Sequence, residues 1–191
     1  MSSTIKSNRI KGIMFIIASA LGFAMMSAFV KLAGDLPSFQ KVFFRNLVSA
    51  IIAFWLIIKH KGSLTGKKEN LKVLLYRSIF GTLGVIFNYY AIDKLMLSDA
   101  NMLNKMSPFL VVIFCAIALK EKINVKQIGA IIIAFIGALF IIKPTFSVEV
   151  IPYLGGIAGA VFAAMAYTCL RVLGDREDYY TIVFFFSVFS L

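Results

Sequence analysis

The stretch GIMFIIASALGFAMMSAFV, residues 12–30, contains no charged side chain. An α-helix rises ~1.5 Å per residue, so a helix of about 20 residues crosses the ~30 Å hydrocarbon core of a bilayer. This stretch therefore predicts a membrane-spanning helix. Similar apolar runs follow it along the chain, which argues against a cleaved signal peptide.

The composition extends this interpretation to the whole chain. With 60% hydrophobic and 15% charged residues among 191, the protein carries more apolar surface than a soluble domain of this length buries. The runs are continuously apolar, whereas strands of a membrane β-barrel alternate over about ten residues. The sequence therefore predicts an all-α integral membrane protein, a multi-pass helical bundle. Further helices are expected at residues 39–58, 71–92, 100–119, 125–142, 150–170 and from about 179 to 191.

Positive charge is distributed unevenly between the two sides of the predicted membrane. The net charge is +11, and most basic residues lie between the apolar runs, which indicates topology rather than a nucleic-acid partner. With a cytoplasmic N-terminus, 14 Lys and Arg fall on the inner side and 6 on the outer side. The sequence thus predicts a protein of the cytoplasmic (inner) cell membrane with its N-terminus inside. The inner set is Lys6, Arg9, Lys11, Lys59, Lys61, Lys67, Lys68, Lys72, Arg77, Lys120, Lys122, Lys126, Arg171 and Arg176, and the outer set is Lys31, Lys41, Arg45, Lys94, Lys105 and Lys143.

Residues suited to metal binding or nucleophilic chemistry are few. Cys115 and Cys169 both lie inside apolar runs, which is typical of small core residues rather than of a disulfide framework. The single histidine, His60, lies in a basic loop. We therefore expect no metal site and no cofactor.

An internal repeat appears when the chain is compared with itself at an offset of 140 residues. ASALGFAMMSAFVKLAGD, residues 18–35, then aligns with AGAVFAAMAYTCLRVLGD, residues 158–175, and Lys31 corresponds to Arg171. The offset spans five predicted helices, which is an odd number. The second copy must therefore enter the membrane upside down, as in the inverted repeats of secondary transporters.

Several stretches in a fixed order resemble a known family. They are FVKLAG at the end of the first helix, FFRNLVSA, NYYAIDKL, MSPFLVVIFCAIALKEK and QIGAIIIAFIGALFI. By their order and spacing, over nearly the whole chain, they are similar to the drug/metabolite transporter superfamily in its EamA-type branch.

The resemblance implies ten helices in two inverted five-helix repeats that export or exchange amino acids, metabolites or drugs. Residues 10–143 would form the first repeat, and residues 150–191 the start of the second. The chain departs from the family by stopping in the second helix of repeat two. We therefore expect a second copy, in a homodimer, or missing C-terminal helices to complete the transporter, and we expect no transport by a monomer of this chain.

Polar side chains are expected in one outer layer of the membrane. Arg45 and Lys105 each lie about six residues, roughly 9 Å, inside the outer ends of their helices. Asn46 and Asn104 adjoin these two cations, and Asn88 lies one turn inside the third helix. A charge inside the membrane costs about 2.5–3.5 kcal/mol, so two cations at one depth need a wet cavity or acceptors that hold them. Such a cavity would favour a solute with a carboxylate or another anionic group.

For Lys105 two interpretations stay open. Ser107 and Pro108 favour a cavity residue, because a proline weakens the local helical hydrogen bonding. Alternatively, Lys105 is an anchor that reaches the lipid headgroups. Tyr89 and Tyr90 beside Asn88 are similarly either interfacial aromatic residues or solute ligands.

Other residues are candidates for the apolar part of the cavity. Phe23, Met26 and Ser27 on the first helix and Tyr167 on the sixth would form an adaptable pocket, with ordinary core packing as the alternative for each. Small residues indicate where helices pack closely. These are Gly155, Gly159 and Ala163 on one helix, Ala130, Ala134 and Ala138 on another, and Gly81 and Gly84 on a third. Glu121 is expected to be a cytoplasmic helix-end charge, with a gating role as the alternative.

Together these features predict a secondary transporter that moves a small organic solute, such as an amino acid, metabolite or drug, by alternating access across the lipid bilayer. One alternative is an inactive truncated or non-transporting membrane protein. Another is a lipid-modifying enzyme in which Arg45 and Lys105 hold a phosphate headgroup. That enzyme would need an acid, a histidine or a phosphate-binding glycine loop at membrane level, which this sequence lacks, so we expect no enzymatic activity.

Overall fold

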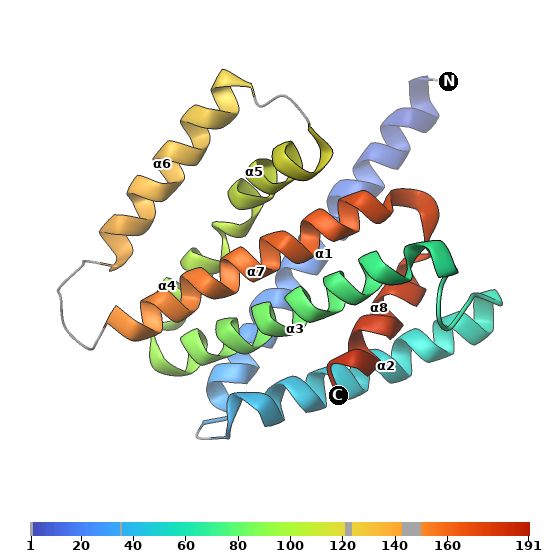
Figure 1. The fold of residues 1–191 in the computed structure, drawn as a ribbon, viewed down its shortest axis with the longest axis horizontal. Helices are drawn as coiled ribbons and strands as arrows, with labels where there is room; N and C mark the ends of the chain where they lie inside the picture. Colours follow the sequence, from blue (N-terminus) through green and yellow to red (C-terminus); the bar gives the residue numbers. More distant parts are fainter. Residues whose placement is uncertain (1, 35, 121–123, 143–149) are drawn as a thin grey trace.

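The computed structural model is a bundle of helices (Figure 1) and describes residues 2–34, 36–120, 124–142 and 150–191. These residues contain helices and turns but no strand, which confirms the all-α prediction. The helices are α1 Ser2–Leu32, α2 Ser38–His60, α3 Leu71–Lys94, α4 Leu97–Asn104, α5 Ser107–Leu119, α6 Val125–Ile142, α7 Ile151–Leu173 and α8 Tyr179–Phe189, with short turns η1 Lys68–Asn70 and η3 Gly174–Arg176.

The lengths of the helices agree with a protein that crosses a membrane several times. Five segments of the described chain are long and apolar enough to span a bilayer, and two shorter helices are also apolar. The multi-pass prediction is therefore confirmed. The five segments are Ile10–Leu32, Ser38–His60, Lys68–Lys94, Leu97–Leu119 and Ile151–Leu173, and the shorter two are Val125–Gly137 and Tyr179–Phe189.

The fourth predicted helix is divided in two. The sequence predicts one helix over residues 100–119, but α4 ends at Asn104 and α5 begins at Ser107. Pro108 stands in the first turn of α5. Its ring clashes with the carbonyl group four residues earlier, that of Asn104, and it has no N–H to donate. The prediction of an unbroken helix is therefore wrong at Lys105 and Met106.

Helices α3 and α7 lie side by side in the centre of the bundle and form its most extensive helix pair (Figure 1). A Cβ atom added to Gly84 would lie 3.0 Å from the Ala163 backbone nitrogen, and one added to Gly159 would lie 3.0 Å from that of Asn88. The two backbones therefore touch where the side chains are smallest. Close packing, predicted for Gly84, Gly159 and Ala163, is confirmed.

Helix α8 packs mainly against α2 and also against α3 (Figure 1). Its start is fixed by hydrogen bonds to the loop between α2 and α3. The carboxylate of Glu177 accepts from the Lys67 backbone N–H at 2.8 Å and from Asn70 Nδ2 at 2.7 Å. Thr181 Oγ1 donates to the Ser63 carbonyl oxygen at 2.7 Å. We call these contacts the inner latch, because they lie at the end predicted to be cytoplasmic.

The inner latch provides a position for testing the orientation. Thr65 is exposed in this loop. In a variant with Cys115 and Cys169 replaced by alanine, Thr65→Cys should resist a membrane-impermeant maleimide in intact cells and react after permeabilisation, because the Lys and Arg asymmetry places this loop inside. Ser98 is exposed at the start of α4, close in sequence to the opposite end of α3. Ser98→Cys is the control and should react in intact cells. Efficient labelling of Thr65→Cys from outside would reverse the topology.

The contact between α3 and α7 predicts an effect on stability. Gly159→Leu should destabilise the protein by about 1–3 kcal/mol, because the new side chain would force two touching backbones apart. Gly22→Leu on α1 is the control, since a Cβ atom there has no neighbour within 4 Å. Thermal unfolding in detergent measures both. Equal melting temperatures for the two variants would show that the glycine contact does not hold these helices together.

Candidate functional site

Two arginines from neighbouring helices converge on one aromatic ring. The guanidinium carbon of Arg77 on α3 lies 4.0 Å from the centroid of the Phe186 ring on α8, and that of Arg45 on α2 lies 6.0 Å from the same centroid. Arg45 Nη1 also donates to Asn46 Oδ1 at 3.1 Å. We call Arg45, Asn46, Arg77 and Phe186 the arginine cluster.

Arg77 corrects one part of the sequence analysis, which counts it among the cytoplasmic charges. It lies six residues after the start of α3, about 9 Å along the helix, and its Nε and Nη1 atoms are buried. Gly81 makes room for it, because a Cβ atom there would lie 2.6 Å from Arg77 Nη1. The direction of the topology bias does not change when Arg77 is removed from the count. In the sequence, Arg77 could have been recognised because it lies within a largely apolar run, four positions before Gly81.

The arginine cluster concentrates positive charge within the apolar layer. Each cation costs about 2.5–3.5 kcal/mol there, and the two guanidinium groups lie close enough to repel each other. The Asn46 side chain offsets part of this cost for Arg45, and the face of the Phe186 ring offsets part of it for Arg77. Among the described residues, neither guanidinium forms an ion pair. The cluster is therefore suited to receive an anionic group.

Further hydrogen-bond donors surround this region. In the described part of the chain, the buried side-chain atoms without a partner all lie on α2, α3 and α8, and all of them are able to donate. A buried donor without an acceptor costs about 1–3 kcal/mol, so such a set on three adjoining helices indicates a binding site. These atoms are Asn46 Nδ2, Arg77 Nε and Nη1, Ser78 Oγ, Tyr89 Oη and Ser187 Oγ.

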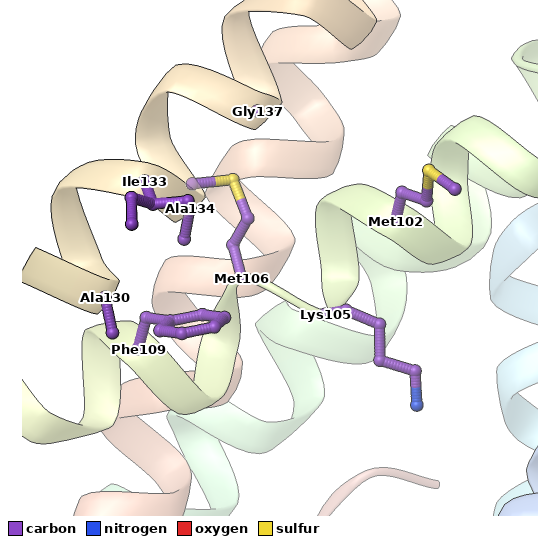
Figure 2. Close-up of a pocket in the computed structure, with 8 residues that line it drawn as sticks. All are labelled: Met102, Lys105, Met106, Phe109, Ala130, Ile133, Ala134 and Gly137. Atoms are coloured by element: carbon purple, nitrogen blue, oxygen red, sulfur yellow. The ribbon is translucent and has the colours of Figure 1, made fainter. Parts of the chain in front are cut away.

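Lys105 lies in different surroundings from Arg45. It is exposed at the break between α4 and α5, where it borders an open pocket of about 590 Å³ that also includes Met106, Phe109 and part of α6. Figure 2 shows its side chain extending away from the pocket wall formed by α6. Asn104 beside it is half-buried, and Ser107 is buried.

The other candidates divide between the core and the surface. Met26 packs against the core around Tyr89, and Ser27 is buried and donates to Asn101 Oδ1 at 3.3 Å. Asn88 is half-buried where α3 meets α7. Phe23 and Tyr167 are exposed on α1 and α7. Tyr167 lies close enough to Arg77 to interact with it electrostatically.

The remaining sequence predictions concern the cysteines, a metal site, Glu121 and Ala138. Cys115 is buried on α5, as predicted for a small core residue, with its sulfur 3.9 Å from Thr168 Oγ1. In the described residues, no three side chains of His, Cys, Asp or Glu come together as a metal site. Glu121 and the side chain of Ala138 lie outside what the structure describes.

The comparison with known families covers most of the chain. Residues 10–143 match the EamA-like transporter family. The chain belongs to this family. Its relatives place it in the drug/metabolite transporter superfamily, which confirms the resemblance drawn from the sequence motifs.

Relatives of this EamA-like protein occur in bacteria and animals. It is 33% identical over 177 residues to the pseudopaline exporter CntI of Pseudomonas aeruginosa (strain UCBPP-PA14), covering 92% of this chain and 62% of the exporter. It is 27% identical over 179 residues to an uncharacterized transporter of Helicobacter pylori (strain J99), covering 92% and 60%. It is 26% identical over 193 residues to human solute carrier family 35 member G1, covering 94% and 53%. The chain thus spans less than two thirds of these relatives, and no solved structure matches it.

The EamA-like chain also has a paired charge at the end of its helices that is predicted to face outward. Lys41 on α2 is buried, and its Nζ lies 2.6 Å from Asp93 Oδ1 on α3 and 2.9 Å from the Gly34 carbonyl oxygen. Ser38 Oγ donates to the other oxygen of Asp93 at 2.8 Å. We call Ser38, Lys41 and Asp93 the outer clamp. It fixes the start of α2 to the end of α3.

Lys31 adds a second connection at this end. Its Nζ donates to the carbonyl oxygens of Ile92, Asp93 and Leu95 at 2.7, 3.2 and 2.9 Å. These carbonyl groups belong to the C-terminal turn of α3, where the helix dipole favours a cation. From the sequence, Lys31 and Lys41 are only topology charges, because Ile92 and Asp93, which accept their hydrogen bonds on α3, lie more than 50 positions away in the chain.

The outer clamp predicts that Asp93→Asn lowers the free energy of unfolding by about 1–3 kcal/mol. This is less than the 3–5 kcal/mol typical of a fully buried pair, because Lys41 keeps the Gly34 carbonyl group and Asp93 is partly exposed. Glu69→Gln removes the same charge from an exposed site and is the control. Thermal unfolding in detergent at neutral pH measures both. Equal stability of Asp93→Asn and the parent protein would show that the outer clamp does not contribute to the free energy of unfolding.

Proposed function

We propose that the protein is part of a secondary transporter that exports a small organic solute with an anionic group across the cytoplasmic membrane. Membership of the EamA-like family supports transport in general, and the 33% identity to a pseudopaline exporter supports the outward direction. The arginine cluster supports the anionic group, because it offers two cations with no acidic partner among the described residues. Transport rather than enzymatic activity fits the names of the relatives.

One observation carries this proposal. Arg45 and Arg77 come from α2 and α3, in the proposed first repeat (residues 10–143), whereas Phe186 comes from α8, in the proposed second repeat (residues 150–191). Alternating-access transporters bind their solutes at the interface between inverted repeats. The arginine cluster lies at such an interface, where rocking of one repeat against the other would change its exposure.

The division into repeats also bears on the assembly. The matched relatives are longer than this chain, and α7 and α8 represent only the first two helices of the proposed second repeat. Further helices, or those of a second copy, would complete the wall of the cavity. The lipid bilayer and the solute are the partners that this function requires.

The test uses the protein at its full natural length in proteoliposomes loaded with a small-molecule extract of cells. The expected result is depletion of one or a few anionic solutes relative to protein-free liposomes loaded with the same extract. Mass spectrometry identifies the depleted solutes. A protein present in the correct orientation that depletes no solute would contradict the proposal.

Two variants then locate the anionic group. Arg45→Met should weaken solute affinity roughly tenfold to a hundredfold, corresponding to about 1.5–3 kcal/mol for a charge-assisted hydrogen bond. Lys105→Met should change it less than about threefold, because an exposed lysine that extends away from the pocket wall fits the anchor interpretation. Folding should survive in both, since Arg45→Met removes a costly charge and Lys105 is exposed. Loss of affinity only in Lys105→Met would show that the anionic group of the solute binds at the break between α4 and α5 and not at the arginine cluster.

A further inference from the structure

We infer that Arg77 is a solute-binding residue, and that it forms with Arg45 a site for a carboxylate group with a preference for dicarboxylates. This inference deepens the proposed function, on which it rests for the source of the carboxylate. The inference goes beyond the proposed function in three respects. It assigns Arg77 to the binding site, names the chemical class of the ligand, and gives Phe186 and Gly81 positioning roles.

The stacking geometry leaves the binding edge of Arg77 available. The guanidinium carbon lies 4.0 Å from the centroid of the Phe186 ring, a cation–π contact that uses none of the N–H donors as a hydrogen bond to a carboxylate would. The N–H bonds of a guanidinium point outward in its own plane, and a carboxylate binds along that edge through two parallel hydrogen bonds. Two such donor atoms, Nε and Nη1, are buried and have no acceptor among the described residues. Each of the two edges at which a guanidinium binds a carboxylate contains one of these atoms, paired with Nη2.

The space around Arg77 depends on Gly81. A Cβ atom at this position would lie 2.6 Å from Arg77 Nη1 and 2.8 Å from the Phe186 ring. The glycine follows Arg77 by four residues and therefore lies on the same face of α3. Its missing side chain lets the guanidinium and the ring stack. Gly81 thus positions the two groups without contacting the ligand.

The charges favour a ligand with two negative groups. Arg45 and Arg77 repel each other, and no described side chain neutralises either of them. One carboxylate neutralises only half of this charge, whereas two carboxylates on a short chain neutralise both cations. A neutral donor next to Arg45, Asn46 Nδ2, is also buried and without an acceptor, as is Ser78 Oγ on the same helix as Arg77. The site therefore offers positive charge and N–H and O–H donors, which is the chemistry that recognises carboxylate oxygens.

The inference is tested by binding to the full-length protein purified in detergent, at constant ionic strength. The probes are succinate, butyrate and succinamide, which share a four-carbon chain but carry two, one and no negative charges. Melting temperature and isothermal titration calorimetry report binding. We expect succinate to raise the melting temperature saturably, butyrate to bind at least tenfold more weakly, and succinamide to have no effect.

Three variants identify the residues responsible. Arg77→Gln should weaken succinate binding at least tenfold and abolish the preference over butyrate. Gly81→Ala keeps both charges but displaces the guanidinium, and it should also weaken succinate binding at least tenfold with butyrate less affected. Lys72→Gln is the matched control: it removes a positive charge from an exposed position on the same helix and should bind as the parent does. Melting temperatures without ligand show whether each variant is folded.

Four results of the binding experiments would overturn the inference. They are no response of the parent protein to succinate, equal binding of succinate by the parent protein and Arg77→Gln, an equal response to succinamide, and a response to inorganic phosphate but not to succinate. If a carboxylate of the protein itself occupied the site, Arg77→Gln would lower the melting temperature without ligand and the parent would not bind succinate. Solute export by Arg77→Gln at the parent rate would refute this inference and leave the proposed function intact. Absence of export by the parent would refute the proposed function regardless of succinate binding.

Discussion

The backbone contact between α3 and α7 determines the position of the helix on which the rest of the described structure depends. Inside a membrane, apolar side chains gain little by leaving lipid for protein, so helices associate through close packing of small residues and through hydrogen bonds. Gly84, Gly159 and Ala163 supply that packing. Helix α3 then presents Asp93 to α1 and α2 at its outer end, Arg77 to α8 in its inner half, and the Tyr89 ring to the core in between. A change in the contact with α7 would alter all three.

The protein treats its cations within the bundle in two ways. Lys41 has a carboxylate and a carbonyl oxygen as acceptors, and this satisfied charge connects two helices. Arg45 and Arg77 share an aromatic ring, and Arg45 alone also donates to an amide oxygen, but neither has a carboxylate among the described residues. Since polar groups inside a membrane are expensive, a satisfied group is explained by structure alone, whereas an unsatisfied pair indicates function. This contrast is the physical reason for placing the solute at the arginine cluster and not at the outer clamp.

The sequence predicted the helices well because long apolar runs have few alternatives in a membrane. It also indicated Arg45 as a cavity residue, because Arg45 lies deep inside such a run, and this role stays a prediction. It placed Arg77 in the cytoplasmic charge count, because a cation six residues from a helix start can extend either to water or inward, and only the neighbouring α8 and Gly81 decide which. The pairing of Lys41 with Asp93 joins residues 52 positions apart, so no local pattern indicates it. The break at Lys105 was indicated by Pro108, but its effect on the helix was underestimated.

The inner latch has a mechanical consequence. Glu177 and Thr181 fasten the first turn of α8 to the loop that joins α2 and α3, while seven residues separate Tyr179 from Phe186. Contacts of α8 with α2 and α3 continue beyond the latch, so a tilt of α8 would slide it over these helices, and its displacement would grow with distance from the latch. Phe186 would therefore sweep sideways over the two guanidinium groups when α8 tilts, while the latch itself stays closed. A small rotation at the cytoplasmic surface would uncover or cover the arginines without breaking any helix.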